Sequence, residues 1–542
     1  MSSSGLPNGF VDTIRAPLFS THESGVHLTY EWRVEQLNTL YRMIRDRRQV
    51  FVEALAKDLG RYPTESVCAE IIPIETEVQY MLQHLKGWMK PEYVSTPLLM
   101  FPARAWIQSK PLQPPGVLII GPFNYPLQLC LKPLAGALAG GNPCVIKPSE
   151  MTPNTAKALN ECIREYFDPS VVQVVLGAIP ETEVLLAQPW AKVLFTGSAR
   201  VGKIVAEACA RTLTPCILEC GGKSATVVDE TVPVSQIQNV ADRIVFAKFF
   251  NSGQVCIAPD TLFVHDIHVE TLVKALRRSI EAQFGKDPQA GEMARIVCPQ
   301  SAQRLVDIIT ELEQDVRHNN SKLLLGGSEL SDAQQRYVAP TLVLNPSSSS
   351  RVMTEEIFGP ILPICSFSHC DEAIKRIQEL SNVTGIPLFL YVFTKSNQVF
   401  QKFAQKCQSG GAVRNDVLIQ LANPELPLGG LGNSGYGRYF GKYSFDAFTH
   451  KYPVTYRPLG SIWDFGNLRC HPYQGWKSKL LEDFLLYLPK VPASLPPSRM
   501  LLLCLFPIAF VSFQNTMGEH PWSWKSMLAT QLERAANALR NS

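Results

Sequence analysis

Residues 116–126 read Gly-Val-Leu-Ile-Ile-Gly-Pro-Phe-Asn-Tyr-Pro, an apolar run with glycine at both ends and a proline-bracketed turn after it. Such a run is typical of a buried parallel strand, which has apolar neighbours on both faces. Further strand-like and helical patterns alternate along the chain, at residues 143–147, 154–166, 171–175, 192–195 and 200–212. The alternation predicts an α/β fold with ligands beyond the carboxyl ends of the strands.

A second alternating block begins near Cys220. Its candidate strands and helices lie at residues 225–228, 234–250, 262–264, 269–284, 302–316, 370–380 and 388–393. Apolar residues at helical spacing predict two long helices within residues 31–90, the first of them ended by Gly60. Residues 95–110 are rich in proline and aromatic residues, which indicates an extended arm.

The bulk composition excludes several classes of protein. With 542 residues, 46% of them apolar and 18% charged, the chain is folded and long enough for two or three domains. A net charge of +3 gives no basic field, so no nucleic-acid partner is expected. The 14 cysteines show no metal-binding spacing and the first residues lack a signal-peptide core. We therefore expect no metal, reduced thiols and a cytoplasmic setting.

One thiol and one carboxylate stand out as candidate reacting groups. Cys256 lies in residues 249–260, between a polar, glycine-containing turn and an Ala-Pro step, which can offer a thiol to a substrate. Glu219 ends a short apolar run and precedes two glycines, so another group can approach its carboxylate closely. Such a pair is the minimum for a covalent acyl intermediate that water later hydrolyses.

Polar side chains follow the first two predicted strands. Asn124 would offer an N–H donor where an oxyanion develops, and the backbone N–H of Cys256 would supply the second donor. The alternative is that Asn124 only shapes the turn between its prolines. Lys147 and Glu150, at the end of the second strand, can hydrogen-bond ribose hydroxyls of a dinucleotide. An ordinary strand-to-helix turn is the alternative for this pair.

A candidate phosphate site follows the strand at 192–195. Residues 195–202 read Phe-Thr-Gly-Ser-Ala-Arg-Val-Gly and open a helix. Gly197, Ser198 and the free N–H groups of the helix start make a natural pyrophosphate site that extends to Gly202. The run differs from the Gly-x-Gly-x-x-Gly fingerprint of conventional dinucleotide-binding folds.

In this order, the motifs resemble those of the aldehyde dehydrogenase superfamily over about residues 30–455. Asn124-Tyr125-Pro126 and the Gly-Lys-Tyr-Ser-Phe-Asp run at 441–446 are similar to class 3 members, which include fatty aldehyde and fungal apocarotenal dehydrogenases. The resemblance implies an α/β fold with two parallel-sheet domains and a bridging, oligomerising β-arm. The implied parts are an NAD-binding domain (1–94 and 111–218), a catalytic domain (219–412), the arm (95–110 and 413–455) and a C-terminal extension (456–542).

The resemblance also implies a mechanism. Cys256, its pKa lowered by local dipoles, attacks an aldehyde carbon, and Asn124 stabilises the oxyanion. Loss of a hydride leaves a thioester, which a water activated by Glu219 hydrolyses. Burial is expected to raise the pKa of Glu219 so that it accepts a proton near neutral pH.

The segment Glu-Glu-Ile-Phe-Gly-Pro at 355–360 resembles the one that meets the nicotinamide end of the cofactor in this family. Glu356 would then bond the nicotinamide ribose, and Phe358 would press on the ring. The cofactor expected is NAD, because the Glu150 carboxylate would repel a 2′-phosphate. NADP remains the alternative, since class 3 relatives use either.

The chain continues past the catalytic fold into an apolar tail. Residues 500–513 are fourteen uncharged residues, fewer than the roughly 20 of a spanning helix. Arg499 precedes them, and Trp522 and Trp524 follow like interfacial anchors. We expect an interfacial or re-entrant segment on the cytosolic face of an internal membrane. A tail helix packed on the catalytic domain or on a dimer partner is the alternative.

The expected substrate is a long apolar (fatty) aldehyde, oxidised to its carboxylic acid by a homodimer, with an apocarotenal as the alternative substrate. A CoA-acylating enzyme is a further alternative, although the water-activating glutamate argues against it. A non-catalytic dinucleotide-binding scaffold is the alternative of another class. A scaffold would need none of Cys256, Glu219 and Asn124.

Overall fold

The computed structural model describes residues 6–7, 9–97, 100, 103–318, 321–459, 470–473, 478 and 490–491. The predicted apolar segment at 500–513 lies outside these residues. The chain forms two compact units. The larger comprises residues 1–88 and 111–449, and the smaller comprises residues 89–110 and the chain from 450 onward.

The first sheet of the larger unit has the strand order β16-β8-β7-β4-β5-β6. Its strands are β4 (Val117–Ile120), β5 (Cys144–Lys147), β6 (Val172–Val174), β7 (Lys192–Gly197), β8 (Cys216–Cys220) and β16 (Gly435–Tyr436). Neighbours are parallel except β16, which runs antiparallel to β8. β4 and β5 are buried along their whole length, as their apolar runs predict.

The second sheet of this unit has the order β11-β12-β13-β10-β9-β14-β15. Its strands are β9 (Ala225–Val228), β10 (Thr261–His265), β11 (Lys322–Leu325), β12 (Thr341–Leu344), β13 (Ile361–Phe367), β14 (Phe389–Phe393) and β15 (Gly411–Arg414). Only β11 among these described strands pairs antiparallel. Two mostly parallel sheets with helices confirm the predicted α/β fold class.

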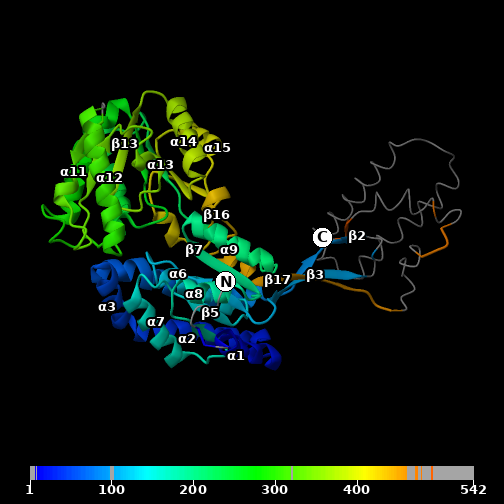
Figure 1. Ribbon diagram of the computed structural model, residues 1–542. Helices are drawn as coiled ribbons and strands as arrows, with labels where there is room; N and C mark the ends of the chain where they lie inside the picture. Colours follow the sequence, from blue (N-terminus) through cyan, green and yellow to red (C-terminus); the bar gives the residue numbers. More distant parts are fainter. Residues whose placement is uncertain are drawn as a thin grey trace, which may run out of the picture. The chain divides into compact units, whose positions relative to one another are not determined.

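Helices flank both sheets, and Figure 1 shows several of them around β13. In the larger unit they are α1 (Phe10–Ser24), α2 (Tyr30–Asp46), α3 (Arg48–Leu59), α4 (Pro63–Ser66), α5 (Ile72–Trp88), α6 (Gln128–Ala139), α7 (Pro153–Tyr166), α8 (Ile179–Leu186), α9 (Ala199–Arg211), α10 (Ile237–Phe249), α11 (Val269–Phe284), α12 (Pro299–His318), α13 (Arg351–Thr354), α14 (Cys370–Thr384), α15 (Asn397–Lys406) and α16 (Gly441–Ala447). One apolar core joins α12, α14 and α15 to the second sheet, and another joins α1, α8 and α9 to the first.

The two long helices predicted within residues 31–90 are interrupted in the structure. The first breaks at Arg47 (φ −105°, ψ 14°) into α2 and α3 and ends at Gly60, whose φ of 60° is left-handed, as predicted. The second begins with the short α4 and a π-helical turn, Val67–Ile71, before α5. The π turn places buried Glu70 against the first turn of α6 through the hydrogen bond from Gln128.

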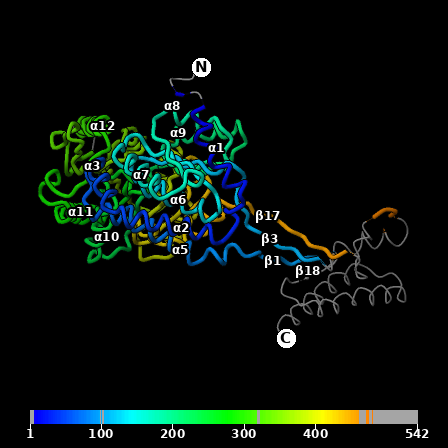
Figure 2. The backbone as a smooth tube through the Cα atoms, turned by 90° about the horizontal axis from the view of Figure 1, so that it is seen from below, coloured from blue at the N-terminus to red at the C-terminus, as the bar shows by residue number. Residues whose placement is uncertain are grey.

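The smaller unit contains a three-stranded sheet of β1 (Glu92–Val94), β3 (Arg104–Pro111) and β17 (Thr449–Tyr456), which Figure 2 shows side by side. β2 (Thr96–Pro97) pairs with β18 (Lys490–Val491). The extended structure predicted for residues 95–110 is therefore present where the chain is described. Among the described residues, no helix is both long and apolar enough to cross a membrane.

Candidate active site

Three separate elements carry the predicted reacting groups. Asn124 follows β4, Glu219 lies near the end of β8, and Cys256 follows the 3-10 turn Phe250–Gly253 at the end of α10. The Asn124 Nδ2 donates to the Gln254 carbonyl at 3.0 Å, and the charge of Glu219 acts on the Cys256 thiol. The structure thus brings all three together, and their catalytic roles remain predictions.

The turn before Cys256 has an uncommon backbone. Asn251, Ser252 and Gly253 all have left-handed φ values, of 50°, 53° and 77°. A non-glycine residue in such a region costs on the order of 1–3 kcal/mol and persists only where its surroundings enforce it. The Asn251 N–H donates to Glu65 Oε1 at 2.8 Å, and Gln254 Nε2 donates to the Asn251 carbonyl at 3.0 Å.

A buried arginine fixes this turn to Asn124. Arg61 is 2% exposed, and its Nε donates to Asn251 Oδ1 at 2.9 Å. Its remaining two nitrogens donate to Glu70 Oε1 at 2.6 Å and to the Asn124 carbonyl. The guanidinium also lies 4.7 Å from the centroid of the Tyr125 ring. Arg61 therefore holds both sides of the predicted oxyanion site, and no local pattern in the sequence indicates this role.

The side-chain amide nitrogen of Asn124 already donates one hydrogen bond. Its Nδ2 carries two hydrogens, and one of them serves the Gln254 carbonyl. The second can donate to an oxyanion, in line with the predicted role. Asn124 is 3% exposed, and its carbonyl accepts from Asn251 Nδ2 at 3.0 Å. The hydrogen bonds of Asn124 to this turn also fit the alternative interpretation, that Asn124 only shapes its turn.

The electrostatics of Cys256 differ from the sequence expectation. Burial, followed by the negative charges of Glu356 and Glu219, raises the pKa of Cys256 to about 12. The prediction that local dipoles lower this pKa is wrong for the protein alone, because desolvation outweighs the backbone hydrogen bonds to the sulfur. In the protein alone the Cys256 sulfur is thus protonated near neutral pH.

Glu219 has the environment expected of a general base. It is 4% exposed, and burial raises its pKa well above its ordinary value, with an opposing effect from the Arg438 charge. Neither carboxylate oxygen has a hydrogen-bond partner among the described residues. When it is ionised, such a carboxylate has both oxygens available to accept a proton from water.

Glu356 reaches the glycines that follow Glu219. Its Oε1 accepts from the Gly222 N–H at 3.0 Å, and a Cβ on Gly221 would collide with its carboxylate. Burial raises the pKa of Glu356 to about 7, with an added contribution from the Asp260 charge. The close approach of the Glu356 carboxylate to the backbone thus requires glycine at position 221. Phe358, with a φ of 50°, lies edge to face with Phe123 at 5.8 Å.

The residues predicted to bind the cofactor lie at the carboxyl edge of the first sheet. Lys147 Nζ donates to Glu150 Oε2 at 2.8 Å and to the Pro148 carbonyl at 2.9 Å. Partial burial opposes ionisation of Glu150, yet the Lys147 hydrogen bond holds its pKa below its ordinary value. A pocket of about 530 Å³, lined by Ser149, Glu150 and Glu181 among others, adjoins them.

The residues predicted to face a phosphate lie at the junction of β7 and α9. Gly197 ends β7, Ser198 caps α9 by accepting from the Val201 N–H at 3.4 Å, and Gly202 lies in the first turns of the helix. Thr196 Oγ1 is buried without a hydrogen-bond partner among the described residues. An orphaned hydroxyl beside a helix N-terminus fits a phosphate-bearing cofactor.

A largely apolar cavity of about 770 Å³ leads to Cys256. Tyr125, Leu129, Val255, Ile257 and Phe440 are among its lining residues. Three large apolar side chains of its lining are well exposed, namely Ile72 (46%), Phe246 (47%) and Ile419 (59%). The cavity therefore has an apolar, exposed rim.

One buried ion pair interrupts the apolar wall of this cavity. Lys132 and Glu77 both line it, are 2% and 1% exposed, and place Nζ 3.5 Å from Oε2. The ammonium also lies 3.2 Å from the centroid of the Phe440 ring. The sequence analysis missed this pair, because each member lies within an apolar helix pattern.

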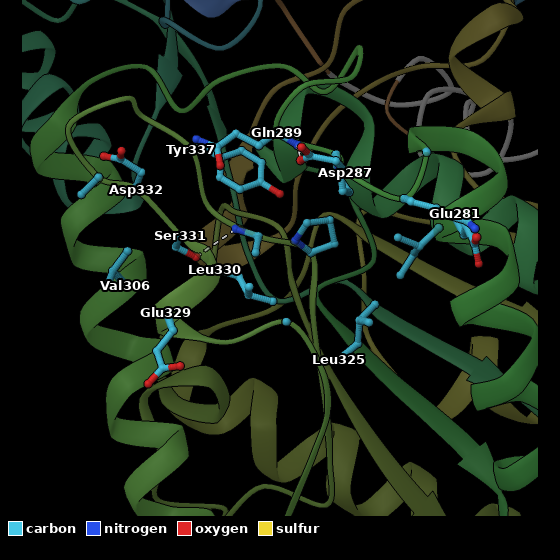
Figure 3. A pocket seen from close by; sticks show the side chains of 18 of the residues that line it. Glu281, Asp287, Gln289, Val306, Leu325, Glu329, Leu330, Ser331, Asp332 and Tyr337 are labelled. Carbon is cyan, nitrogen blue, oxygen red and sulfur yellow. Dashed lines mark hydrogen bonds between the residues drawn. The ribbon is translucent and has the colours of Figure 1, made fainter.

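A larger pocket lies elsewhere in the second α/β domain. Figure 3 shows this space of about 1080 Å³, with Asp287, Glu329 and Tyr337 among its lining residues. None of the predicted catalytic or cofactor residues lines it. In the described part of the chain, no cluster of His, Cys, Asp and Glu could hold a metal ion.

A thiol beside a buried carboxylate, with a pocket at the carboxyl ends of parallel strands that two carboxylates help to line, corresponds to the class of oxidoreductases that work through cysteine. Residues 23–453 match the Aldehyde dehydrogenase family. The chain belongs to this family and is an enzyme that oxidises aldehydes. The family uses NAD or NADP.

Individual relatives agree with this assignment. Over 454 residues the chain is 41% identical to a 4,4'-diaponeurosporen-aldehyde dehydrogenase of Staphylococcus aureus (strain NCTC 8325 / PS 47), covering 84% of this chain and 94% of that protein. It is 41% identical over 453 residues to aldehyde dehydrogenase family 3 member B2 of Mus musculus, covering 83% and 90%. A solved structure of the substrate-bound state of Staphylococcus aureus AldH matches with a TM-score of 0.81 and 37% identity, covering 88% and 99%.

Removing Arg61 should weaken both stability and catalysis. Arg61→Met leaves Glu70 buried without its charge partner, which should lower the free energy of unfolding by about 3–5 kcal/mol. The loss of two contacts to Asn251 and Asn124 should lower kcat about tenfold or more. Denaturant unfolding and steady-state kinetics measure the two effects.

Arg42→Met is the matched control, because its ion pair with Glu35 is exposed and should contribute under about 1 kcal/mol. Equal losses in the two variants would contradict this role of Arg61.

The raised pKa of Cys256 predicts its reactivity. Below about pH 10, the thiolate fraction should increase about tenfold for each pH unit, because the pKa is about 12. Alkylation of the cofactor-free protein by iodoacetamide, followed by mass spectrometry of the Cys256 peptide, should show this increase between pH 7 and 9. A rate that levels off near pH 7 would mean that the thiolate already dominates there.

Proposed function

We propose that this enzyme oxidises a long apolar, fatty aldehyde to its carboxylic acid, with an apocarotenal as the alternative substrate. The apolar cavity that ends at Cys256 supports this proposal most directly. A volume of about 770 Å³ exceeds what a short polar aldehyde needs. The relative named for a diaponeurosporen-aldehyde, a carotenoid-derived aldehyde, supports a long apolar substrate and favours the alternative.

Catalysis would follow from the positions of three side chains. The Cys256 sulfur, once deprotonated, bonds to the aldehyde carbon, and the carbonyl oxygen becomes an oxyanion that Asn124 Nδ2 and the Cys256 N–H stabilise. When bound, the nicotinamide dinucleotide supplies the hydride acceptor. Glu219 then takes a proton from the water that attacks the Cys256 thioester, and the acid leaves with the thiol restored.

Lys147, Glu150, Gly197, Ser198 and Gly202 would hold the dinucleotide, with Glu356 and Phe358 at its nicotinamide end. Lys147 and Glu150 are already joined by a hydrogen bond, so the carboxylate is fixed at the rim of its pocket. Glu181 adds a second carboxylate to the same pocket. Two negative charges favour a ribose hydroxyl over a 2′-phosphate, so we expect NAD to be preferred.

The first experiment compares aldehydes and a cysteine variant. The purified protein is assayed for NADH formation with hexanal, hexadecanal and an apocarotenal, without CoA. We expect turnover with a preference for a long substrate, and loss of turnover in Cys256→Ala. Cys370→Ala is the matched control, because this half-buried thiol lies on α14 in a different core, and it should retain activity.

The same assay separates the alternatives. A requirement for CoA would support the alternative of a CoA-acylating enzyme. Absence of any turnover with NAD or NADP would support the alternative of a non-catalytic dinucleotide-binding scaffold. The highest kcat/KM with hexanal would contradict the long-chain proposal. The highest value with the apocarotenal would select the alternative substrate.

Replacing Glu150 should change cofactor selectivity. Glu150→Gln removes the charge that repels a 2′-phosphate, so the ratio of kcat/KM with NAD to that with NADP should fall about tenfold, equivalent to about 1.4 kcal/mol. Glu161→Gln, an exposed carboxylate on α7 outside the pocket, is the control and should leave the ratio unchanged. An unchanged ratio in Glu150→Gln would remove this residue from cofactor selection.

We further propose that the protein is a homodimer that associates with the cytosolic face of an internal membrane. Exposed aromatic residues on the small sheet, Tyr93 (57%) and Tyr456 (56%), favour burial against a second copy. The uncharged run at 500–513 favours the membrane. We expect a dimer mass by light scattering and binding of the full chain to phospholipid vesicles. A monomer, or a chain that stays free of vesicles, would refute the respective part.

A further inference from the structure

A pair of thiols lies at the turn between α9 and β8, and the reaction makes no use of it. Cys209, in the last turn of α9, is 2% exposed, and Cys216, the first residue of β8, is half-buried. Cys216 packs against the apolar core that contains Cys209. The Thr214 N–H donates to the Cys209 carbonyl at 3.0 Å and closes the turn between them, and the two side chains interact.

Polar neighbours surround Cys216 but not Cys209. The Tyr436 hydroxyl lies 2.9 Å from the Cys216 sulfur. Tyr436 is 47% exposed, which leaves the approach to this sulfur open to solvent. Lys192, beside Cys216 in the parallel pairing of β7 with β8, adds a positive charge that acts on the thiol. Cys216 is therefore an accessible sulfur with two donors and a cation around it.

These neighbours change the charge state of the pair. The contact with Cys209 lowers the pKa of Cys216, and the Tyr436 hydrogen bond and the Lys192 charge lower it further. Together they outweigh partial burial and bring this pKa to about 6. The same contact and burial raise the pKa of Cys209. Every other described cysteine with a shifted pKa has it raised. Cys216 is therefore the member of the pair that ionises first.

We propose that Cys216 is a hydroperoxide-reactive site and that Cys209 resolves its oxidised form into a disulfide. An accessible thiolate with a neighbouring thiol is the arrangement that sulfur oxidation by peroxide requires. Neither thiol of the pair lines the cavity that Cys256 lines, and burial raises the pKa of Cys256. This site is independent of the aldehyde substrate.

The chemistry balances with a hydroperoxide as oxidant. The Cys216 thiolate attacks one peroxide oxygen, an S–O bond forms, the O–O bond breaks, and the leaving oxygen takes a proton to become water. The Cys209 sulfur then attacks the sulfenic sulfur, an S–S bond forms and the S–O bond breaks. The Cys209 proton leaves with the hydroxyl as a second water. The two sulfurs lose two electrons in total, and the peroxide gains them.

Peptide mapping of the full-length chain tests the proposal. Cys256→Ala protein is treated with equimolar hydrogen peroxide at pH 7, free thiols are blocked, and the protein is digested with trypsin without reduction. Cleavage after Arg211 places Cys209 and Cys216 on separate peptides, residues 204–211 and 212–223. We expect these peptides to be disulfide-linked. Fragment ions must assign the bond to Cys216 rather than Cys220, which shares its peptide.

Variants identify the role of each sulfur. In Cys209→Ser the reaction should stop at the sulfenic acid, which dimedone captures at Cys216, whereas Cys216→Ser should give neither product. Tyr436→Phe removes one donor to the thiolate, and a rise of about one unit in the pKa of Cys216 should slow the reaction about fivefold at pH 6. Cys162→Ser, a buried helix thiol of raised pKa, is the matched control and should behave like the parent.

Two results would overturn the proposal. One is dimedone labelling that is equal in Cys209→Ser and in the Cys209→Ser/Cys216→Ser double variant. The other is a 204–211 peptide that stays free after peroxide treatment of the parent. Neither readout depends on aldehyde turnover, so failure here is distinct from failure of the proposed function.

Discussion

The arrangement around Cys256 depends on one buried guanidinium. Arg61 comes from the chain between two N-terminal helices, yet it donates to the strained turn before the thiol and to the carbonyl of Asn124. Its charge is balanced by Glu70, whose other oxygen accepts from the first turn of α6. A planar group with five donors in fixed directions suits this task, which a lysine ammonium could not perform. The N-terminal part of the chain thus contributes to the predicted reacting centre through Arg61, which orders the turn before Cys256.

The same enclosure that positions the reacting groups keeps their protons in place. Glu219, Glu356 and Cys256 are desolvated together, and each resists ionisation in the protein alone. Burial favours the protonated form of each group, and a charge brought by a bound partner would change that balance. Low resting reactivity therefore follows from the geometry that also serves catalysis.

Much of the fold and the reacting pair could be predicted from sequence, because each depends on local patterns. The run at 116–121 predicts β4, and the glycine at 60 predicts a helix end. The structure places Cys256, Glu219 and Asn124 together as expected. Arg61, Lys132 and the Cys209–Cys216 pair could not be predicted, since their significance lies in contacts between distant segments or in burial. The shifted pKa of Cys256 escaped prediction for the same reason, as desolvation is a property of packing.

If the enzyme works at a membrane, as we propose, the exposed apolar rim of the cavity that Cys256 lines has a kinetic consequence. An aldehyde that passes from a lipid phase directly onto Ile72, Phe246 and Ile419 does not enter water on the way. Because no apolar surface of the aldehyde is then removed from water, the hydrophobic effect neither assists nor delays its entry. Its supply is then governed by its mole fraction in the lipid and by diffusion in two dimensions. For such an enzyme, adding lipid at constant aldehyde dilutes the substrate, even though the bulk concentration is unchanged.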